Sequence, residues 1–143
     1  MTMKYPEKIW HNGSIKHWAE ATTHVMAHAI HYGSSVFEGV RCYDTPKGPA
    51  IFRLQEHLKR LFASAHIYDM PMPFDQATLT QACKDVIRAN GFGKCYLRPV
   101  AFRGLGGFGL SADCPTDVAV AAWEMGEYLG HAVTETGIDA MVS

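Results

Sequence analysis

Neither positive nor negative charge is in clear excess in this chain. Lysine and arginine number 13 and aspartate and glutamate 14 among 143 residues, so the formal net charge is -1. Nucleic-acid-binding domains carry clustered basic residues, and membrane-surface helices carry basic runs; neither pattern occurs in the sequence. We therefore expect neither nucleic acid nor a membrane as a partner.

Long apolar segments are also missing. The longest apolar run, residues 118–123, is far shorter than the roughly 20 residues of a membrane-spanning helix. Residues 1–8 lack the apolar core of a secretory signal. These absences predict a cytoplasmic protein. A hydrophobic content of 48% over 143 residues is enough to bury one core.

The common metal-ligand patterns are absent as well. The four cysteines are Cys42, Cys83, Cys95 and Cys114. They show no Cys-x-x-Cys spacing, so we expect free, mostly buried thiols. His24, His28 and His31 could share a helix face, but no Asp, Glu or Cys stands among them. We expect packed or hydrogen-bonded histidines there, and no metal site.

Strand patterns open the chain. Asn12-Gly13 separates two strand-like segments, and both residues tolerate the positive φ that a two-residue hairpin turn requires. Residues 35–43 read as a strand, residues 44–49 are dense in turn formers, and residues 50–53 read as the return strand.

Two amphipathic helices are expected next, because apolar residues recur at steps of three and four in two segments. The first stripe is Leu54, Leu58, Leu61, Phe62 and Ala65, and the second is Leu79, Ala82, Cys83, Val86 and Ile87. Asp75 suits the N-cap of the second helix, and Gly91 suits the left-handed position at its C-terminus.

Strand patterns return after the helices. Residues 94–103 and 116–123 are predicted strands, residues 124–130 a loop, and residues 138–142 the start of another strand. Pro99 predicts an edge position or a bulge, because proline cannot donate to a ladder. The order of strands, two helices and strands predicts an α+β fold.

A glycine-rich loop at residues 104–109 contains the pattern Gly-x-Gly-x-x-Gly, formed by Gly104, Gly106 and Gly109. A dinucleotide site needs a helix that opens directly after this motif. Residues 110–115 read as a loop, so we interpret the motif as a flexible loop that lets backbone approach a ligand.

Alternation along residues 94–103 places Tyr96 and Arg98 on one strand face, next to the glycine loop. An arginine there can bind a carboxylate ligand through its planar fork, or it can pair with an internal carboxylate; the pattern alone leaves both open. Composition favours an exposed helix cation for Arg60. These residues indicate an α+β domain with an anion-binding face and do not name a reaction.

A resemblance narrows the function. The chain resembles bacterial-type branched-chain aminotransferases along essentially its whole length, from Ile9 to Ser143. The segments that carry the resemblance are residues 24–43 (HVMAHAIHYGSSVFEGVRCY), 47–53 (KGPAIFR), 56–61 (EHLKRL), 96–99 (YLRP) and 126–130 (GEYLG). The family belongs to the fold-type IV enzymes, which use pyridoxal 5'-phosphate (PLP). Their small domain is an antiparallel-rich sheet with two helices packed on it.

The resemblance assigns roles by position. Arg60 matches the arginine that binds the PLP phosphate. Tyr96 and Arg98 match substrate-pocket residues, the arginine binding a dicarboxylate such as glutamate, and Phe37 matches an apolar wall. The remaining matches are Tyr32 and Leu110, which reach a neighbouring subunit's site in the family dimer, and Tyr128, an aromatic that closes over substrate. Met125 departs from the family's tryptophan, which affects the expected pocket shape.

The resemblance also divides the chain. Residues 1–123 correspond to the N-terminal small domain, residues 124–134 to an interdomain loop, and residues 135–143 to the start of a C-terminal PLP domain. The family's Schiff-base lysine falls beyond Ser143 and matches no lysine here, so no catalytic residue is assigned. We expect the chain alone to be an inactive piece of a transaminase that does not hold PLP stably.

The implied reaction is amino transfer between leucine, isoleucine or valine and 2-oxoglutarate, by a homo-oligomer. Two alternatives remain open: a D-amino-acid aminotransferase or aminodeoxychorismate lyase of the same fold type, and a stand-alone non-catalytic domain. Phe37, Tyr96 and Tyr128 would be bare in an isolated small domain, so we also expect self-association.

Overall fold

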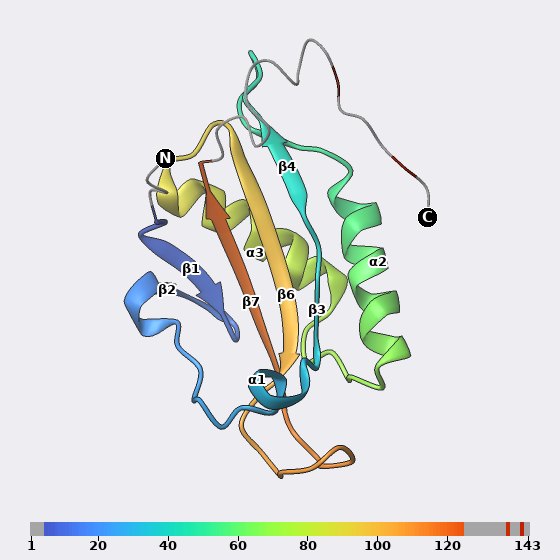
Figure 1. Ribbon diagram of the computed structural model, residues 1–143. Coiled ribbons are helices and arrows are strands. Elements are labelled where there is room, and N and C mark those ends of the chain that lie inside the picture. The colour runs from blue at the N-terminus through green and yellow to red at the C-terminus, as the bar shows by residue number, and fades with distance from the viewer. Residues whose placement is uncertain (1–4, 125–136, 138–140, 142–143) are drawn as a thin grey trace.

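The computed structural model describes residues 5–124 together with Gly137 and Met141 (Figure 1). Within these residues the strands form one seven-stranded sheet with the order β2-β1-β7-β6-β4-β5, and β3 also pairs with β6. Every strand pair is antiparallel. The α+β expectation is confirmed.

The first hairpin joins β1 (Lys8–His11) and β2 (Ser14–His17), as the Asn-Gly signal predicts. Asn12 and Gly13 have φ of 46° and 95°, the left-handed values that such a turn needs. The Asn12 side chain also ties the turn to β7, because its Oδ1 accepts a hydrogen bond of 2.8 Å from the backbone N–H of Val118.

The centre of the sheet is formed by β6 (Cys95–Arg103) and β7 (Thr116–Trp123). Leu97, Pro99 and Ala101 of β6 point into the core, whereas Tyr96 and Arg98 lie half-buried on the opposite face. The predicted alternation is therefore confirmed, and the strand bounds agree to within one residue.

Two predictions of strand length are wrong. The single strand expected over residues 35–43 is divided into β3 (Ser35–Phe37) and β4 (Val40–Tyr43), and both pair with β6. The return strand is only β5 (Ala50–Ile51), because Phe52 and Arg53 form a turn, with φ of 49° at Arg53.

The edge position predicted from Pro99 is also wrong, since β6 lies between β7 and the β3–β4 strands. The Pro99 carbonyl accepts a bond of 3.0 Å from the N–H of Glu38. The return bond cannot form because proline has no N–H. The break between β3 and β4 falls at this point, so a central strand accommodates the proline.

The two predicted helices are α2 (Leu54–Ile67) and α3 (Gln76–Asn90). Asp75 caps α3 by accepting a 2.7 Å bond from the N–H of Thr78, and Gly91 ends it with a φ of 65°. In Figure 1, α3 crosses behind β6 and β7, and α2 runs beside β3 and β4. The fully buried side chains between helices and sheet include Leu58, Leu61, Leu79, Val86, Leu97, Val118 and Val120.

Two short helices lie between β2 and β3: the 3₁₀ turn η1 (Trp18–Glu20) and α1 (His28–Tyr32).

All four cysteines are free and buried, as predicted. In the part of the chain that the structure describes, no helix is long and apolar enough to cross a membrane.

Candidate active site

The face of the sheet that the helices do not cover carries an arginine among three aromatic rings. The guanidinium carbon of Arg98 lies 4.3 Å from the ring centroid of Phe37, 5.3 Å from that of Tyr96 and 5.6 Å from that of Trp123. Tyr96 and Arg98 come from β6, Phe37 from β3 and Trp123 from β7, where it pairs with Tyr96. Cation–π attraction to these rings orients the guanidinium.

Arg98 has hydrogen-bonding capacity to spare. Its Nη2 donates to the Tyr96 hydroxyl at 3.0 Å, whereas its Nε is buried and has no partner among the described residues. Across residues 5–124 no ion pair joins Arg98 to a carboxylate. The alternative of an internal carboxylate partner therefore has no support in the described part of the chain, and a carboxylate ligand suits the free donors.

Gly39 sets the position of Tyr96. A Cβ built at Gly39 would overlap the hydroxyl oxygen of Tyr96 and lie 3.0 Å from its ring carbon Cζ. Only glycine leaves room for the ring at this break between β3 and β4, so the backbone break helps to place the hydroxyl that contacts Arg98.

A second arginine lies on α2. The side chain of Arg60 is 67% exposed, but its Nε and Nη2 each donate a 2.6 Å bond to the two oxygens of Glu38. Glu38 is only 5% exposed and also accepts a 2.9 Å bond from Nδ1 of His57. The bonds from Arg60, aided by the one from His57, hold the pKa of the Glu38 carboxyl below its usual value although burial opposes the shift. Arg60 is thus an exposed helix residue whose guanidinium is held in place by a buried carboxylate.

The short helix α1 and the glycine loop are joined by His28. Its Nε2 donates to the carbonyl of Gly109 at 2.9 Å, which leaves Nδ1 to accept from the Ser34 hydroxyl at 2.7 Å in the neutral ring. Tyr32 and Leu110 lie on the surface of these two segments, 36% and 85% exposed.

The other two histidines of this region contact the backbone, as expected. His24 accepts a bond from the N–H of Met26 and His31 donates to the carbonyl of Val25, so these histidines are hydrogen-bonded to backbone. The described residues contain no group of three or more side chains able to hold a metal ion. Residues 110 and 111 form a turn and residues 112–115 have no regular structure, so no helix opens directly after Gly109.

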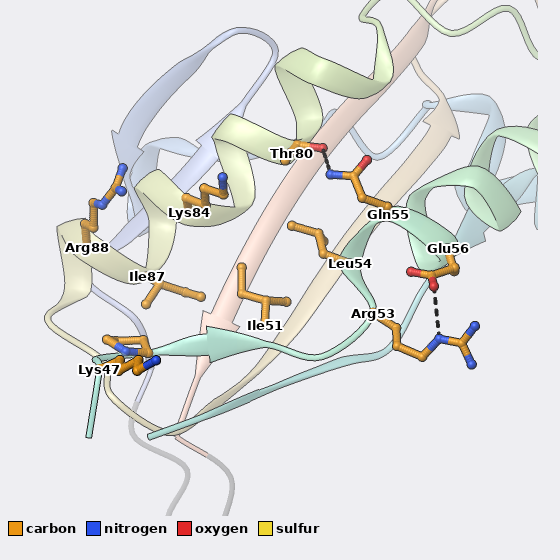
Figure 2. A pocket seen from close by; sticks show the side chains of 11 residues that line it. Lys47, Ile51, Arg53, Leu54, Gln55, Glu56, Thr80, Lys84, Ile87 and Arg88 are labelled. Atoms are coloured by element: carbon orange, nitrogen blue, oxygen red, sulfur yellow. Dashed lines mark hydrogen bonds and ion pairs between the residues drawn. The ribbon is translucent and has the colours of Figure 1, made fainter. Parts of the chain in front are cut away.

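A surface pocket of about 600 Å³ lies elsewhere, between β5, α2 and α3 (Figure 2). Its apolar part is formed by Ile51, Leu54 and Ile87, which point toward one another in the figure. None of the residues expected in the site lines it. Leu110 lines a second pocket of about 740 Å³ with His66 and Arg103.

The structure brings Phe37, Tyr96 and Arg98 together, as a shared site requires, and places Arg60 separately on α2. Tyr128 and Met125 lie outside the described residues.

Two residues that contact the arginines, Trp123 and Glu38, are not among the site residues predicted from the sequence. Alternation in β7 could have indicated Trp123, because Val118, Val120 and Ala122 are buried in the core. For Glu38 the signal was a lone carboxylate in an apolar strand pattern.

Comparisons with known proteins show the family of this chain. The sequence profile of the amino-transferase class IV family matches residues 35–140. The branched-chain-amino-acid aminotransferase of Escherichia coli K12 is 50% identical over 100% of this chain, which covers 47% of that protein. The chain thus spans about half the length of the curated relatives it matches.

Solved structures match closely. The crystal structure of the Escherichia coli branched-chain amino acid aminotransferase has a TM-score of 0.91 and 49% identity, over 96% of this chain and 46% of that one. The branched-chain aminotransferase of the archaeon Thermoproteus uzoniensis with norvaline has a TM-score of 0.81 and 34% identity, over 86% of this chain and 42% of that one. From its fold and these similarities, the chain belongs to the amino-transferase class IV family.

Proposed function

We propose that the complete protein is a PLP-dependent branched-chain aminotransferase that transfers the amino group between leucine, isoleucine or valine and 2-oxoglutarate. The observation that carries this proposal is Arg98, whose Nε has no partner among the described residues and whose guanidinium lies beside Tyr96 and Phe37 on the sheet face opposite the helices. The 50% identity with a branched-chain-amino-acid aminotransferase supports the substrate class.

The surroundings of Arg60 support a cofactor-binding role for this residue. Arg60 presents an exposed guanidinium whose plane is held by the buried carboxylate of Glu38, and such a fork suits a phosphate. In the proposed enzyme Arg60 holds the PLP phosphate. When bound, PLP supplies the electron sink that amino transfer requires.

The open sheet face then serves the substrate. Arg98 and the Tyr96 hydroxyl orient a substrate carboxylate, and the Phe37 ring forms an apolar wall against which a branched side chain packs and excludes water. Tyr128 is proposed to cover the substrate. None of these residues moves a proton in the proposal, because the lysine that does so is not among the residues assigned here.

We also propose a homo-oligomer in which Tyr32 and Leu110 reach the site of a second copy. The support is an exposed apolar surface on α1 and the glycine loop, which includes Phe108 at 61% exposure, with its ring 5.7 Å from that of Tyr32. Surfaces of this kind favour association. Light scattering over a range of concentrations tests this proposal, and a monomer at every concentration would contradict it.

The function is tested by an absorbance titration of the complete protein with PLP, followed by borohydride reduction and peptide mapping. We expect one lysine to be trapped, and activity with L-leucine, L-isoleucine and L-valine. Activity confined to D-amino acids or to aminodeoxychorismate would overturn the branched-chain assignment. The 143-residue chain is expected to trap no unique lysine and to be inactive; specific trapping at one of its lysines would contradict this.

A further inference from the structure

Two arginine–glutamate pairs involve helix α2, and they differ in the sequence separation and burial of their partners. Arg53, the N-cap residue of α2, pairs with Glu56 in the first turn; their side chains are 63% and 57% exposed and are joined by one bond of 3.1 Å (Figure 2). Arg60 is joined by two bonds of 2.6 Å to Glu38, which comes from the break between β3 and β4 and is almost fully buried. The tertiary fold, and not helix spacing, makes the second pair.

The geometry of the second pair leaves part of Arg60 free. A guanidinium has N–H donors on Nε, Nη1 and Nη2. Glu38 takes the Nε donor and one Nη2 donor, and within residues 5–124 the two Nη1 donors and the second Nη2 donor have no partner. Because the Arg60 side chain is 67% exposed, this remaining edge is accessible to an anion.

Glu38 is itself held at several points. Nδ1 of His57 donates to Oε2 of Glu38 at 2.9 Å, and the backbone N–H of Glu38 donates to the Pro99 carbonyl at 3.0 Å. The preceding residue, Phe37, lies over Arg98 at 4.3 Å. Two adjacent residues, the last of β3 and the first of the break after it, thus contact the two arginines of the proposed site.

We propose that Glu38, supported by His57, is a positioning residue that orients Arg60 so that its free N–H edge binds the cofactor phosphate. This inference rests on the proposed function. Groups that orient a ligating side chain commonly change ligand affinity by about 10- to 100-fold when removed, as at metal sites. Glu38 does not touch the cofactor, so its effect passes only through Arg60.

The test compares PLP with pyridoxal, which lacks the phosphate, on the apo form of the complete protein. Glu38→Gln keeps the side-chain volume and removes the charge. We expect its dissociation constant for PLP to rise about tenfold, with that for pyridoxal unchanged. The matched control is Glu56→Gln, in the exposed pair, which is expected to change neither constant. His57→Ala should act in the same direction as Glu38→Gln, but more weakly.

A double-mutant cycle identifies the path of the effect. Once Arg60→Ala has removed the guanidinium, Glu38→Gln should cause no further loss of PLP affinity. Equal weakening of PLP and pyridoxal by Glu38→Gln would show a purely structural role and overturn the inference. So would an unchanged PLP affinity in both Glu38→Gln and His57→Ala while Arg60→Ala weakens it, and that result would leave the proposed function standing. A wild-type protein that binds no PLP would overturn the proposed function, and the inference with it.

If Glu38→Gln does not fold, as judged by circular dichroism, His57→Ala decides the question. The His57 side chain is 21% exposed, and its loss removes one of the three side-chain bonds to Glu38. A selective loss of PLP over pyridoxal affinity would support the inference, and an equal loss or no loss would overturn it.

Discussion

The two faces of the central sheet differ in what their side chains do. Toward the helices, Leu97, Val118 and Val120 have no exposed area and form the core. On the opposite face, Tyr96 and Arg98 remain half-buried and Phe37 is 56% exposed. One strand, β6, contributes to both sets through its alternating side chains. If the open face binds the substrate as proposed, stability and ligand binding are carried by alternate residues of a single strand.

The largest effect is expected from the core face. Leu97→Ala should lower the free energy of unfolding by about 2–5 kcal/mol, because it removes buried methyl groups and leaves a cavity. Phe37→Ala, on the open face, should change it by less than about 1 kcal/mol. Urea titrations of the two variants measure the contrast. Equal destabilisation would mean that the two faces do not divide stability from binding.

The next effect concerns the open face. Arg98→Gln in the complete protein should raise KM for 2-oxoglutarate by about 10- to 100-fold, because a bond to a charged group is lost, with stability nearly unchanged. Arg88→Gln, in an exposed pair with Asp85, is the control and should leave KM unaltered. An Arg98 variant with normal KM would exclude it from carboxylate binding.

A smaller effect is expected at the break between β3 and β4. Gly39→Ala should destabilise the protein by about 1–3 kcal/mol, because the added methyl overlaps the Tyr96 hydroxyl and the ring must move. The Tyr96 ring centroid lies 4.9 Å from that of Trp123, so near-ultraviolet circular dichroism should report the movement. An unchanged spectrum together with unchanged stability would show that the site tolerates a Cβ at this position.

The smallest effect concerns pH and the Glu38 pair. The pKa of Glu38 is lowered in the folded state, chiefly by the bonds from Arg60, so this group stabilises the fold above its unfolded pKa, near 4.5. The contribution is lost as pH falls through the lower, folded pKa. Glu38→Gln should therefore show a shallower loss of stability than wild type as pH falls below about 4.5. Parallel profiles in urea titrations would contradict this.

Local signals predicted the elements well. The Asn12-Gly13 turn, the Asp75 cap and the Gly91 helix end depend on a few neighbouring residues, and each has the predicted conformation. The alternation of β6 correctly placed Tyr96 and Arg98 on one face. Pro99 misled because its local rule assumes a continuous neighbouring strand, whereas β3 and β4 break opposite it.

The sequence by itself thus determined the helices, the main strands, the parity of β6 and the family resemblance, because those depend on short-range periodicity and on motifs. Only the tertiary structure decided that Trp123 joins the aromatic side chains around Arg98 and that Glu38 binds Arg60. Both contacts join residues far apart in the chain, and their partners are set by strand register and helix packing, which local preference does not specify.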